Sequence, residues 1–186
     1  GRLTRPGPSS EIRLELRDPR GRKVGLANGS LRAAGAAFEI ENLVAGPEKW
    51  DAEHPALYHL GVSLVEDGEL SWSKDSALRF REVEVRGNRF LVNGRPVKMR
   101  GACRHDIHPL LGRTSTPGYE LMDVLLAKDA NINFIRTSHY PPTESFLSLC
   151  DEHGLYVEDE TAVCFVGSHR TAEYAPGASE SSAEFT

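Results

Sequence analysis

The fold of this chain is decided by residues 132–160, which read INFIRTSHYPPTESFLSLCDEHGLYVEDE. Two short apolar runs, at 132–135 and 155–157, are typical of short buried strands. Between them apolar residues recur at helical spacing, and Gly154 stands where a helix can end in the left-handed conformation that glycine adopts without steric cost. The helical residues are Phe146, Leu147, Leu149 and Cys150. The stretch therefore predicts a strand, a helix and a strand in succession.

The same alternation extends back to Gly101. Apolar side chains recur at helical spacing over residues 121–130, and a strand is predicted before them, close to Gly101. Strand, helix, strand, helix and strand in this order are the signature of parallel βαβ units. The sequence from Gly101 to residue 160 therefore predicts a parallel sheet.

The first half of the chain reads as antiparallel strands and turns. Apolar and charged residues alternate over 11–17, the period of two that places apolar side chains on one face of a half-buried sheet. Further strands are predicted at 37–44 and 57–65. A hairpin is predicted around Asn93-Gly94, because both central positions of a type I′ turn need positive φ. Short strands punctuated in this way favour an antiparallel sandwich.

Composition excludes several classes of protein. Of the 186 residues, 39% are hydrophobic and 26% are charged, as in folded globular chains. Twenty-two basic residues face 27 acidic ones, and the basic residues are scattered, so we expect no nucleic-acid partner. The chain has no long apolar run and begins with a polar segment, so neither a membrane span nor a signal peptide is expected. Three cysteines are too few for a disulfide framework, and free thiols are predicted.

Polar side chains capable of chemistry follow each predicted strand of the second half. In α/β barrels the loops after the strands form the active-site face, so these groups are expected to converge at one end of the sheet. They are Arg104, His105 and His108 after the first strand, Arg136, Ser138 and His139 after the second, and Asp159 and Glu160 after the third.

These residues carry a resemblance to a known family. The run NFIRTSHYP at 133–141, followed by Phe146-Leu147, Asp151, Gly154 and LYV at 155–157, is similar to the signature of glycoside hydrolase family 2. That family includes β-galactosidases, β-glucuronidases and β-mannosidases. Trp50 with PALY at 55–58, and FREV at 80–83, resemble the end of the family's first sandwich domain and its passage to the catalytic barrel. The resemblance spans Trp50 to Gly167.

The resemblance implies roles for individual residues. The run RHDIHP at 104–109 is most similar to β-galactosidases, which implies a β-galactoside substrate. Arg104, His105 and His139 are implied to bind the sugar, and Arg136 to orient the nucleophilic carboxylate. Charge-assisted hydrogen bonds from imidazole and guanidinium groups suit both tasks.

The chain departs from the family pattern at two places. Cys103 stands where the family usually has asparagine. Cys164-Phe165-Val166 replaces the acid and histidine with which many β-galactosidases bind a metal, so no magnesium is expected there. No cofactor is expected either.

Length limits what the chain contains. A retaining glycosidase needs two carboxylates about 5–5.5 Å apart, and the family carries its acid in an Asn-Glu pair, which this sequence lacks. A complete barrel takes about 250 residues, far more than follow Val83. We therefore predict a partial immunoglobulin-like β-sandwich (1–82), the N-terminal part of an α/β TIM barrel (83–167) and a mobile tail (168–186). The chain alone is predicted to be inactive and to need the remainder of the barrel as its partner.

Several alternatives stay open. The chain could be a noncatalytic carbohydrate-binding or assembly fragment, or belong to the β-glucuronidase or β-mannosidase subclass. Arg136 could merely balance a buried acid. Asp159 and Glu160 could form a catalytic pair, although adjacent strand residues point to opposite faces. A zinc site is disfavoured by ligand spacing, and Cys150 fits a small buried hydrophobe better than a nucleophile. The sequence does not indicate which sugar is bound or where the protein is located. The zinc site that the spacing disfavours would use Cys103, His105, His108 and Cys164 as ligands.

Overall fold

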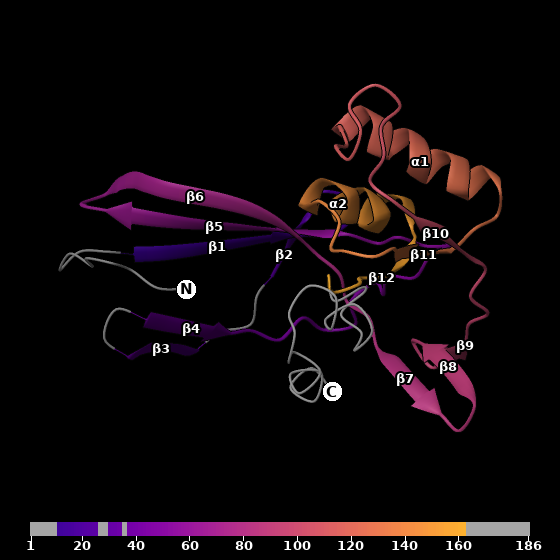
Figure 1. Cartoon of the computed structure of the whole chain (residues 1–186). Coiled ribbons are helices and arrows are strands. Elements are labelled where there is room, and N and C mark those ends of the chain that lie inside the picture. Colours follow the sequence, from indigo (N-terminus) through magenta and orange to yellow (C-terminus); the bar gives the residue numbers. More distant parts are fainter. Residues whose placement is uncertain (1–10, 26–29, 35–36, 163–186) are drawn as a thin grey trace, which may run out of the picture. The chain divides into compact units, whose positions relative to one another are not determined.

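The computed structural model divides into two compact units, Gly1–Val97 and Lys98–Thr186, which are described separately (Figure 1). Residues 11–25, 30–34 and 37–162 are described. The predicted mobile tail at 168–186 and Cys164 lie outside them. The domain boundary predicted at residues 82 and 83 stays a prediction.

The first unit is built on an antiparallel sheet of four strands in the order β2-β1-β5-β6. The antiparallel pairing predicted for the strand at 11–17 is confirmed, and its partner is the strand predicted at 57–65. Asp67 and Gly68 take positive φ at the turn between β5 and β6. The four strands are β1 (Glu11–Arg17), β2 (Lys23–Val24), β5 (Tyr58–Glu66) and β6 (Glu69–Leu78).

Two smaller sheets are also described in this unit. One is an antiparallel hairpin and the other a three-stranded antiparallel sheet in the order β7-β8-β9. The turn predicted at Asn93-Gly94 is confirmed, because both residues have positive φ. The Asn93 side chain donates a hydrogen bond to the carbonyl of Trp50. Trp50 is completely buried. The strands are β3 (Ser30–Ala34), β4 (Ala37–Glu41), β7 (Val83–Arg86), β8 (Arg89–Val92) and β9 (Arg95–Pro96).

The second unit confirms the predicted alternation of strands and helices. Its three strands pair in parallel in the order β10-β11-β12. Threonines cap both helices at their N-termini, and Gly154 ends the second helix with φ of 76°, as expected. The elements are β10 (Gly101–Arg104), α1 (Pro117–Asp129), β11 (Phe134–Thr137), α2 (Glu144–His153) and β12 (Tyr156–Glu158).

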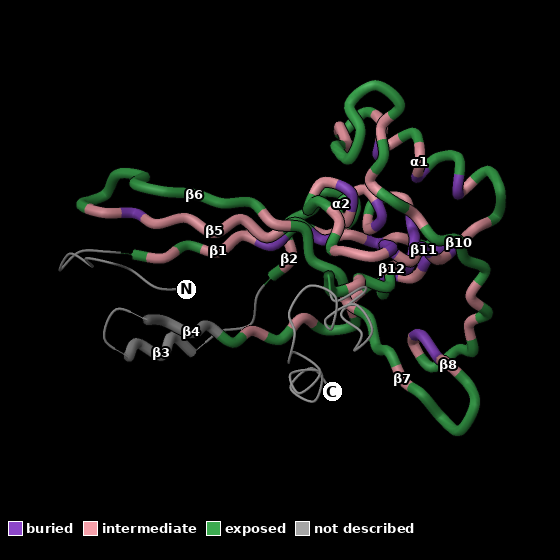
Figure 2. Tube along the Cα trace, in the orientation of Figure 1, coloured by how far each residue is buried: buried purple, intermediate pink, exposed green. Residues whose placement is uncertain are grey.

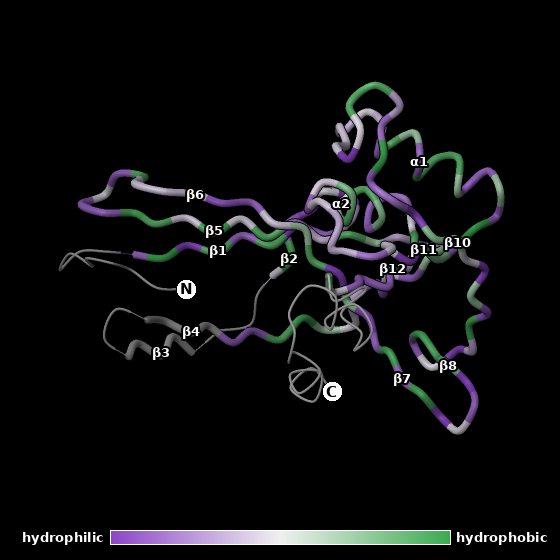
Figure 3. Tube along the Cα trace, in the orientation of Figure 1, coloured by the Kyte–Doolittle hydropathy of each residue, from purple (hydrophilic) through white to green (hydrophobic). Residues whose placement is uncertain are grey.

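The core of the second unit lies where α1 and α2 meet β11 (Figure 2). The apolar residues Met122, Leu125 and Leu126 of α1 are exposed, whereas a different set of α1 residues is buried. The helix therefore has a second apolar face (Figure 3). The buried apolar cluster consists of Val124, Ala127, Ile135, Phe146, Cys150 and Leu155.

Strands β10 and β11 approach each other closely at Gly101. A Cβ atom at this position would lie 2.4 Å from a ring carbon of Phe134 and 3.1 Å from its carbonyl oxygen. Only glycine fits there without displacement of its neighbour. In the part of the chain that the structure describes, no helix is long and apolar enough to cross a membrane.

Candidate active site

Polar residues gather at the carboxyl edge of the parallel sheet. Arg136 lies in β11, His139 follows that strand, and Glu160 follows β12. The Glu160 carboxylate accepts a hydrogen bond from Arg136 Nε through Oε2, at 2.7 Å, and contacts His139 Nδ1 through Oε1, at 3.1 Å. We call these three residues the Glu160 cluster. The structure thus brings together two of the predicted site residues and a carboxylate that had no assigned partner.

The charges of the Glu160 cluster stabilise one another. The hydrogen bond from Arg136 lowers the pKa of Glu160, and the contact with His139 adds to this effect against the cost of burial. The same hydrogen bond raises the pKa of Arg136. Glu160 is therefore ionised at neutral pH and can only accept hydrogen bonds, so the His139 nitrogen facing it carries a hydrogen.

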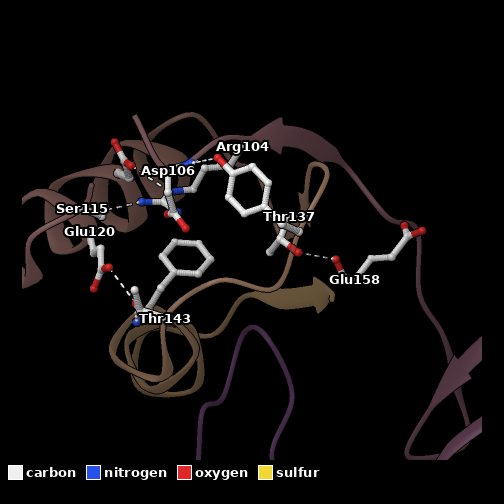
Figure 4. Close-up of polar contacts among 10 residues, drawn as sticks. Arg104, Asp106, Ser115, Glu120, Thr137, Thr143 and Glu158 are labelled. Carbon is white, nitrogen blue, oxygen red and sulfur yellow. Dashed lines mark hydrogen bonds and ion pairs between the residues drawn. The ribbon is translucent and has the colours of Figure 1, made fainter. Parts of the chain in front are cut away.

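The backbone around Glu160 is held by Thr137, which is buried at the end of β11. The Thr137 hydroxyl donates to the carbonyl of Glu158 at 3.3 Å (Figure 4) and accepts from the Glu160 amide at 3.0 Å. These bonds tie the segment after β12 to β11. Between Thr137 and His139, the Ser138–His139 peptide bond is cis.

His105 lies beside the Glu160 cluster. Its ring centroid is 5.3 Å from that of His139, with the planes at 73°, and 6.0 Å from that of Tyr140. His105 directly follows β10 and is exposed. An exposed imidazole next to a second imidazole and an ion pair can offer hydrogen bonds to a polar ligand.

Arg104 lies in a different cluster, between β10 and the two helices (Figure 4). Its side chain is only 10% exposed and forms ion pairs with Asp106 and Asp123, the latter at 2.8 Å. Its guanidinium stacks over the ring of Phe146 at 4.1 Å. Burial by itself would lower the pKa of Arg104, but the hydrogen bonds to the two aspartates outweigh burial and raise it.

His108 and Cys103 take local roles. His108 Nδ1 accepts hydrogen bonds from the amides of Leu110 and Leu111, so this histidine shapes its own loop. Cys103 is exposed and pairs in register with Arg136 across β10 and β11. Among the described residues, no group of three or more histidine, cysteine or acidic side chains is arranged to hold a metal ion.

Comparison with protein families identifies the domain to which this sheet belongs. Residues 83–184, more than half of the chain, match the TIM barrel domain of glycosyl hydrolases family 2. The chain belongs to glycosyl hydrolase family 2. The family resemblance drawn from residues 133–157 is thereby confirmed.

Curated relatives of this family 2 chain carry the name beta-galactosidase. One from Aeromonas hydrophila is 46% identical over 118 residues, which cover 63% of this chain and 12% of the relative. One from Lactobacillus delbrueckii subsp. bulgaricus is 34% identical over 170 residues, covering 91% of this chain and 16% of the relative. The chain spans between a tenth and a sixth of the length of these relatives.

Solved structures of family 2 members share the fold. A Ruminococcus gnavus beta-glucuronidase in complex with uronic isofagomine is 28% identical, with a TM-score of 0.69, and covers 84% of this chain and 25% of that structure. A Parabacteroides merdae beta-glucuronidase has a TM-score of 0.72 at 24% identity, over 83% of this chain and 19% of that structure. The described strands of the second unit form an open three-stranded sheet, not a closed barrel.

Sequence reasoning missed the contacts of Glu160. Treating Asp159 and Glu160 as adjacent strand residues was wrong, because β12 ends at Glu158 and strand alternation does not apply beyond it. The structure shows Arg136 paired with Glu160, a partly buried acid. Pairing with a buried acid was the alternative role left open for Arg136. The signal that could have found this pair is position, since Arg136 lies near the carboxyl end of β11 and Glu160 follows the neighbouring strand β12.

Proposed function

We propose that this chain is the beginning of the catalytic barrel of a family 2 glycoside hydrolase that cleaves β-linked glycosides, foremost β-galactosides, by a retaining mechanism. The observation that carries the proposal is the Glu160 cluster at the carboxyl edge of a family 2 barrel sheet. Relatives named beta-galactosidase favour the galactoside. Structures titled beta-glucuronidase favour a β-glucuronide as the second candidate.

In this proposal the histidines recognise the sugar. His139 donates from Nδ1 to the ionised Glu160 carboxylate, so Nε2 is the nitrogen that meets a sugar hydroxyl. His105 presents a second imidazole, with its ring 5.3 Å away. Two imidazoles at this spacing can bind neighbouring hydroxyl groups of one ring. Glu160 fixes the orientation of His139 without touching the reacting atoms.

Arg136 orients the nucleophile in the proposed mechanism. Its Nε is bonded to Glu160, which fixes the plane of the guanidinium. The Nη groups then offer parallel N–H donors, a geometry that matches a carboxylate. The acid and the nucleophile are two carboxylates supplied by the remainder of the barrel, one to protonate the leaving oxygen and one to attack the anomeric carbon. The chain without them is proposed to be inactive.

We also propose that the first unit is part of an immunoglobulin-like sandwich. Its support is the antiparallel order β2-β1-β5-β6 and the accompanying β3-β4 hairpin.

The alternative function is that of a noncatalytic carbohydrate-binding fragment, which would keep the same histidines without turnover. The two readings differ in whether the encoded protein hydrolyses a glycoside.

The test is to express the full reading frame that encodes this chain and assay nitrophenyl β-galactoside, β-glucuronide and β-mannoside. We expect β-galactoside to be hydrolysed fastest, and Arg136→Ala and His139→Ala each to lower kcat by roughly 10²–10³ with little effect on folding. Arg113→Ala, at an exposed position, is the matched control. Wild-type kcat in both site variants would refute the site, and a faster β-glucuronide would reassign the substrate.

A further inference from the structure

We propose that Arg104 is a positioning residue that holds the His105–Asp106 segment in place, and that it does not contact the sugar. The proposal rests on the proposed function only where it assigns His105 to sugar recognition. It replaces the role that the family resemblance implied for Arg104. The observation behind it is that the guanidinium is enclosed by β10, α1, α2 and the loop between β10 and α1.

Every nitrogen of the Arg104 guanidinium has a protein partner. Nε donates to Asp123 of α1 at 2.8 Å, and Nη1 donates to Asp106. Nη2 lies 3.4 Å from the Ser115 hydroxyl, in the loop before α1. The face of the group rests on the Phe146 ring of α2, which is itself 1% exposed. The fork of donors therefore joins three segments of chain at one point.

A sugar has little access to this group. The Arg104 side chain is 10% exposed, compared with 39% for Arg136 and 35% for His139. Its single charge is already paired with two aspartates, Asp106 and Asp123. A ligand hydroxyl would have to displace a charge-assisted hydrogen bond to reach it, and neutral hydroxyl groups are weaker partners than carboxylates.

The contacts of Arg104 continue towards the Glu160 cluster through Asp106. Arg104 holds the Asp106 carboxylate, and the Asp106 backbone amide donates to the Tyr140 hydroxyl at 3.0 Å. Tyr140 follows His139 directly, and its ring lies 6.0 Å from that of His105. His105 is thus fixed on one side by Arg104 in β10 and on the other by the Asp106–Tyr140 bond. The arrangement sets the spacing between His105 and His139.

The role of Arg104 requires the planar shape of its guanidinium in addition to its charge. Its planar fork reaches Asp123 and Asp106 in different directions at once, whereas a lysine ammonium is a point charge on a flexible stem. Arg104→Lys keeps the positive charge but cannot keep both bonds in their geometry. Tyr140→Phe removes the hydroxyl that accepts from the Asp106 amide, and it leaves the side chains of Arg104 and both aspartates in place.

The direct test is amide hydrogen exchange of Asp106 in the 186-residue chain, read by NMR. We expect exchange to be at least tenfold faster in Arg104→Lys and in Tyr140→Phe, and unchanged in the exposed-site control Arg113→Lys. The Ile135 amide in β11 reports on overall stability and should keep its rate. Wild-type exchange of Asp106 in Arg104→Lys overturns the proposal, and so does equal acceleration at Ile135.

Kinetics of the full reading frame separate positioning from sugar contact. If Arg104 positions His105, Arg104→Lys and Tyr140→Phe lower kcat by similar factors, and the double variant is no slower than the slower single one. If Arg104 contacts the sugar, Arg104→Lys raises KM, and the losses caused by Arg104→Lys and Tyr140→Phe multiply in the double variant. Either result overturns the proposal. Absence of glycosidase turnover in the wild type would contradict the proposed function, and Asp106 exchange would then decide the role of Arg104.

Discussion

Replacing Thr143 by alanine should destabilise the second unit much more than loss of a helix cap explains. The Thr143 hydroxyl accepts a hydrogen bond from the Phe146 amide at 3.1 Å, which caps α2. It also donates to Glu120 Oε1 of α1 at 2.7 Å (Figure 4). Glu120 is 1% exposed, and its Oε2 has no hydrogen-bond partner among the described residues. In Thr143→Ala both side-chain oxygens of Glu120 would be buried without a hydrogen-bond partner among the described residues.

The expected cost follows from these two losses. Removing a threonine N-cap costs about 1 kcal/mol, and leaving a buried acceptor without its partner costs about 1–3 kcal/mol more. The free energy of unfolding should therefore fall by about 2–4 kcal/mol. Thr116→Ala is the matched control, because the Thr116 side chain caps α1 through a 3.4 Å bond and has no described hydrogen bond to a buried carboxyl group. It should lose about 1 kcal/mol or less.

The assay must follow the second unit, and Cys150 of α2 provides the probe. Both tryptophans, Trp50 and Trp72, lie in the first unit, so fluorescence does not report on α2. Burial raises the pKa of the Cys150 thiol to about 12, so alkylation of Cys150 in urea requires opening of the unit. Thr143→Ser should restore the midpoint. A Thr143→Ala midpoint equal to that of Thr116→Ala would mean that the Thr143–Glu120 bond adds nothing to stability.

Three further results are expected. Iodoacetamide should modify Cys103 in the native chain but Cys150 only in denaturant, as read by peptide mass mapping, because Cys103 is exposed and Cys150 is buried. Gly101→Ala should destabilise the second unit by about 1–3 kcal/mol through overpacking, whereas Gly118→Ala, with open space at its Cβ, should not destabilise it. The Glu160 carboxyl should titrate in NMR below its ordinary pKa. Its ion pair therefore stabilises the fold above the ordinary carboxyl range and is lost as the pH falls through the lowered pKa.

Local patterns explain how much of the fold could be predicted. The alternation of strands and helices after Gly101 was predicted because its signals are local. Helical spacing of apolar residues and the glycine that ends a helix, here Gly154, are read from residues close together in the sequence. Strand β6 was not predicted. Its residues are almost all exposed, so no burial pattern indicates it, and it forms through pairing with β5 across a two-residue turn.

The candidate site was predicted only in part. Position after parallel strands placed Arg136 and His139 at one edge, but their shared partner Glu160 depends on where β12 ends. The contacts of Arg104 depend on α1 and α2 folding over β10, and Asp123 is 19 residues away in sequence. Contacts set by tertiary packing have no local signature, so sequence spacing alone could not separate a buried arginine from a ligand-binding one.

We propose above that the carboxyl edge formed by this chain is part of a family 2 active site. The most direct measurement grafts residues 83–162 into the aligned region of the Aeromonas hydrophila beta-galactosidase and follows hydrolysis of nitrophenyl β-galactoside. We predict that the folded chimera turns over, and that Arg136→Ala in the graft lowers kcat by roughly 10²–10³. A folded chimera without turnover, or one equally active with Arg136→Ala, would show that this edge is not part of the active site.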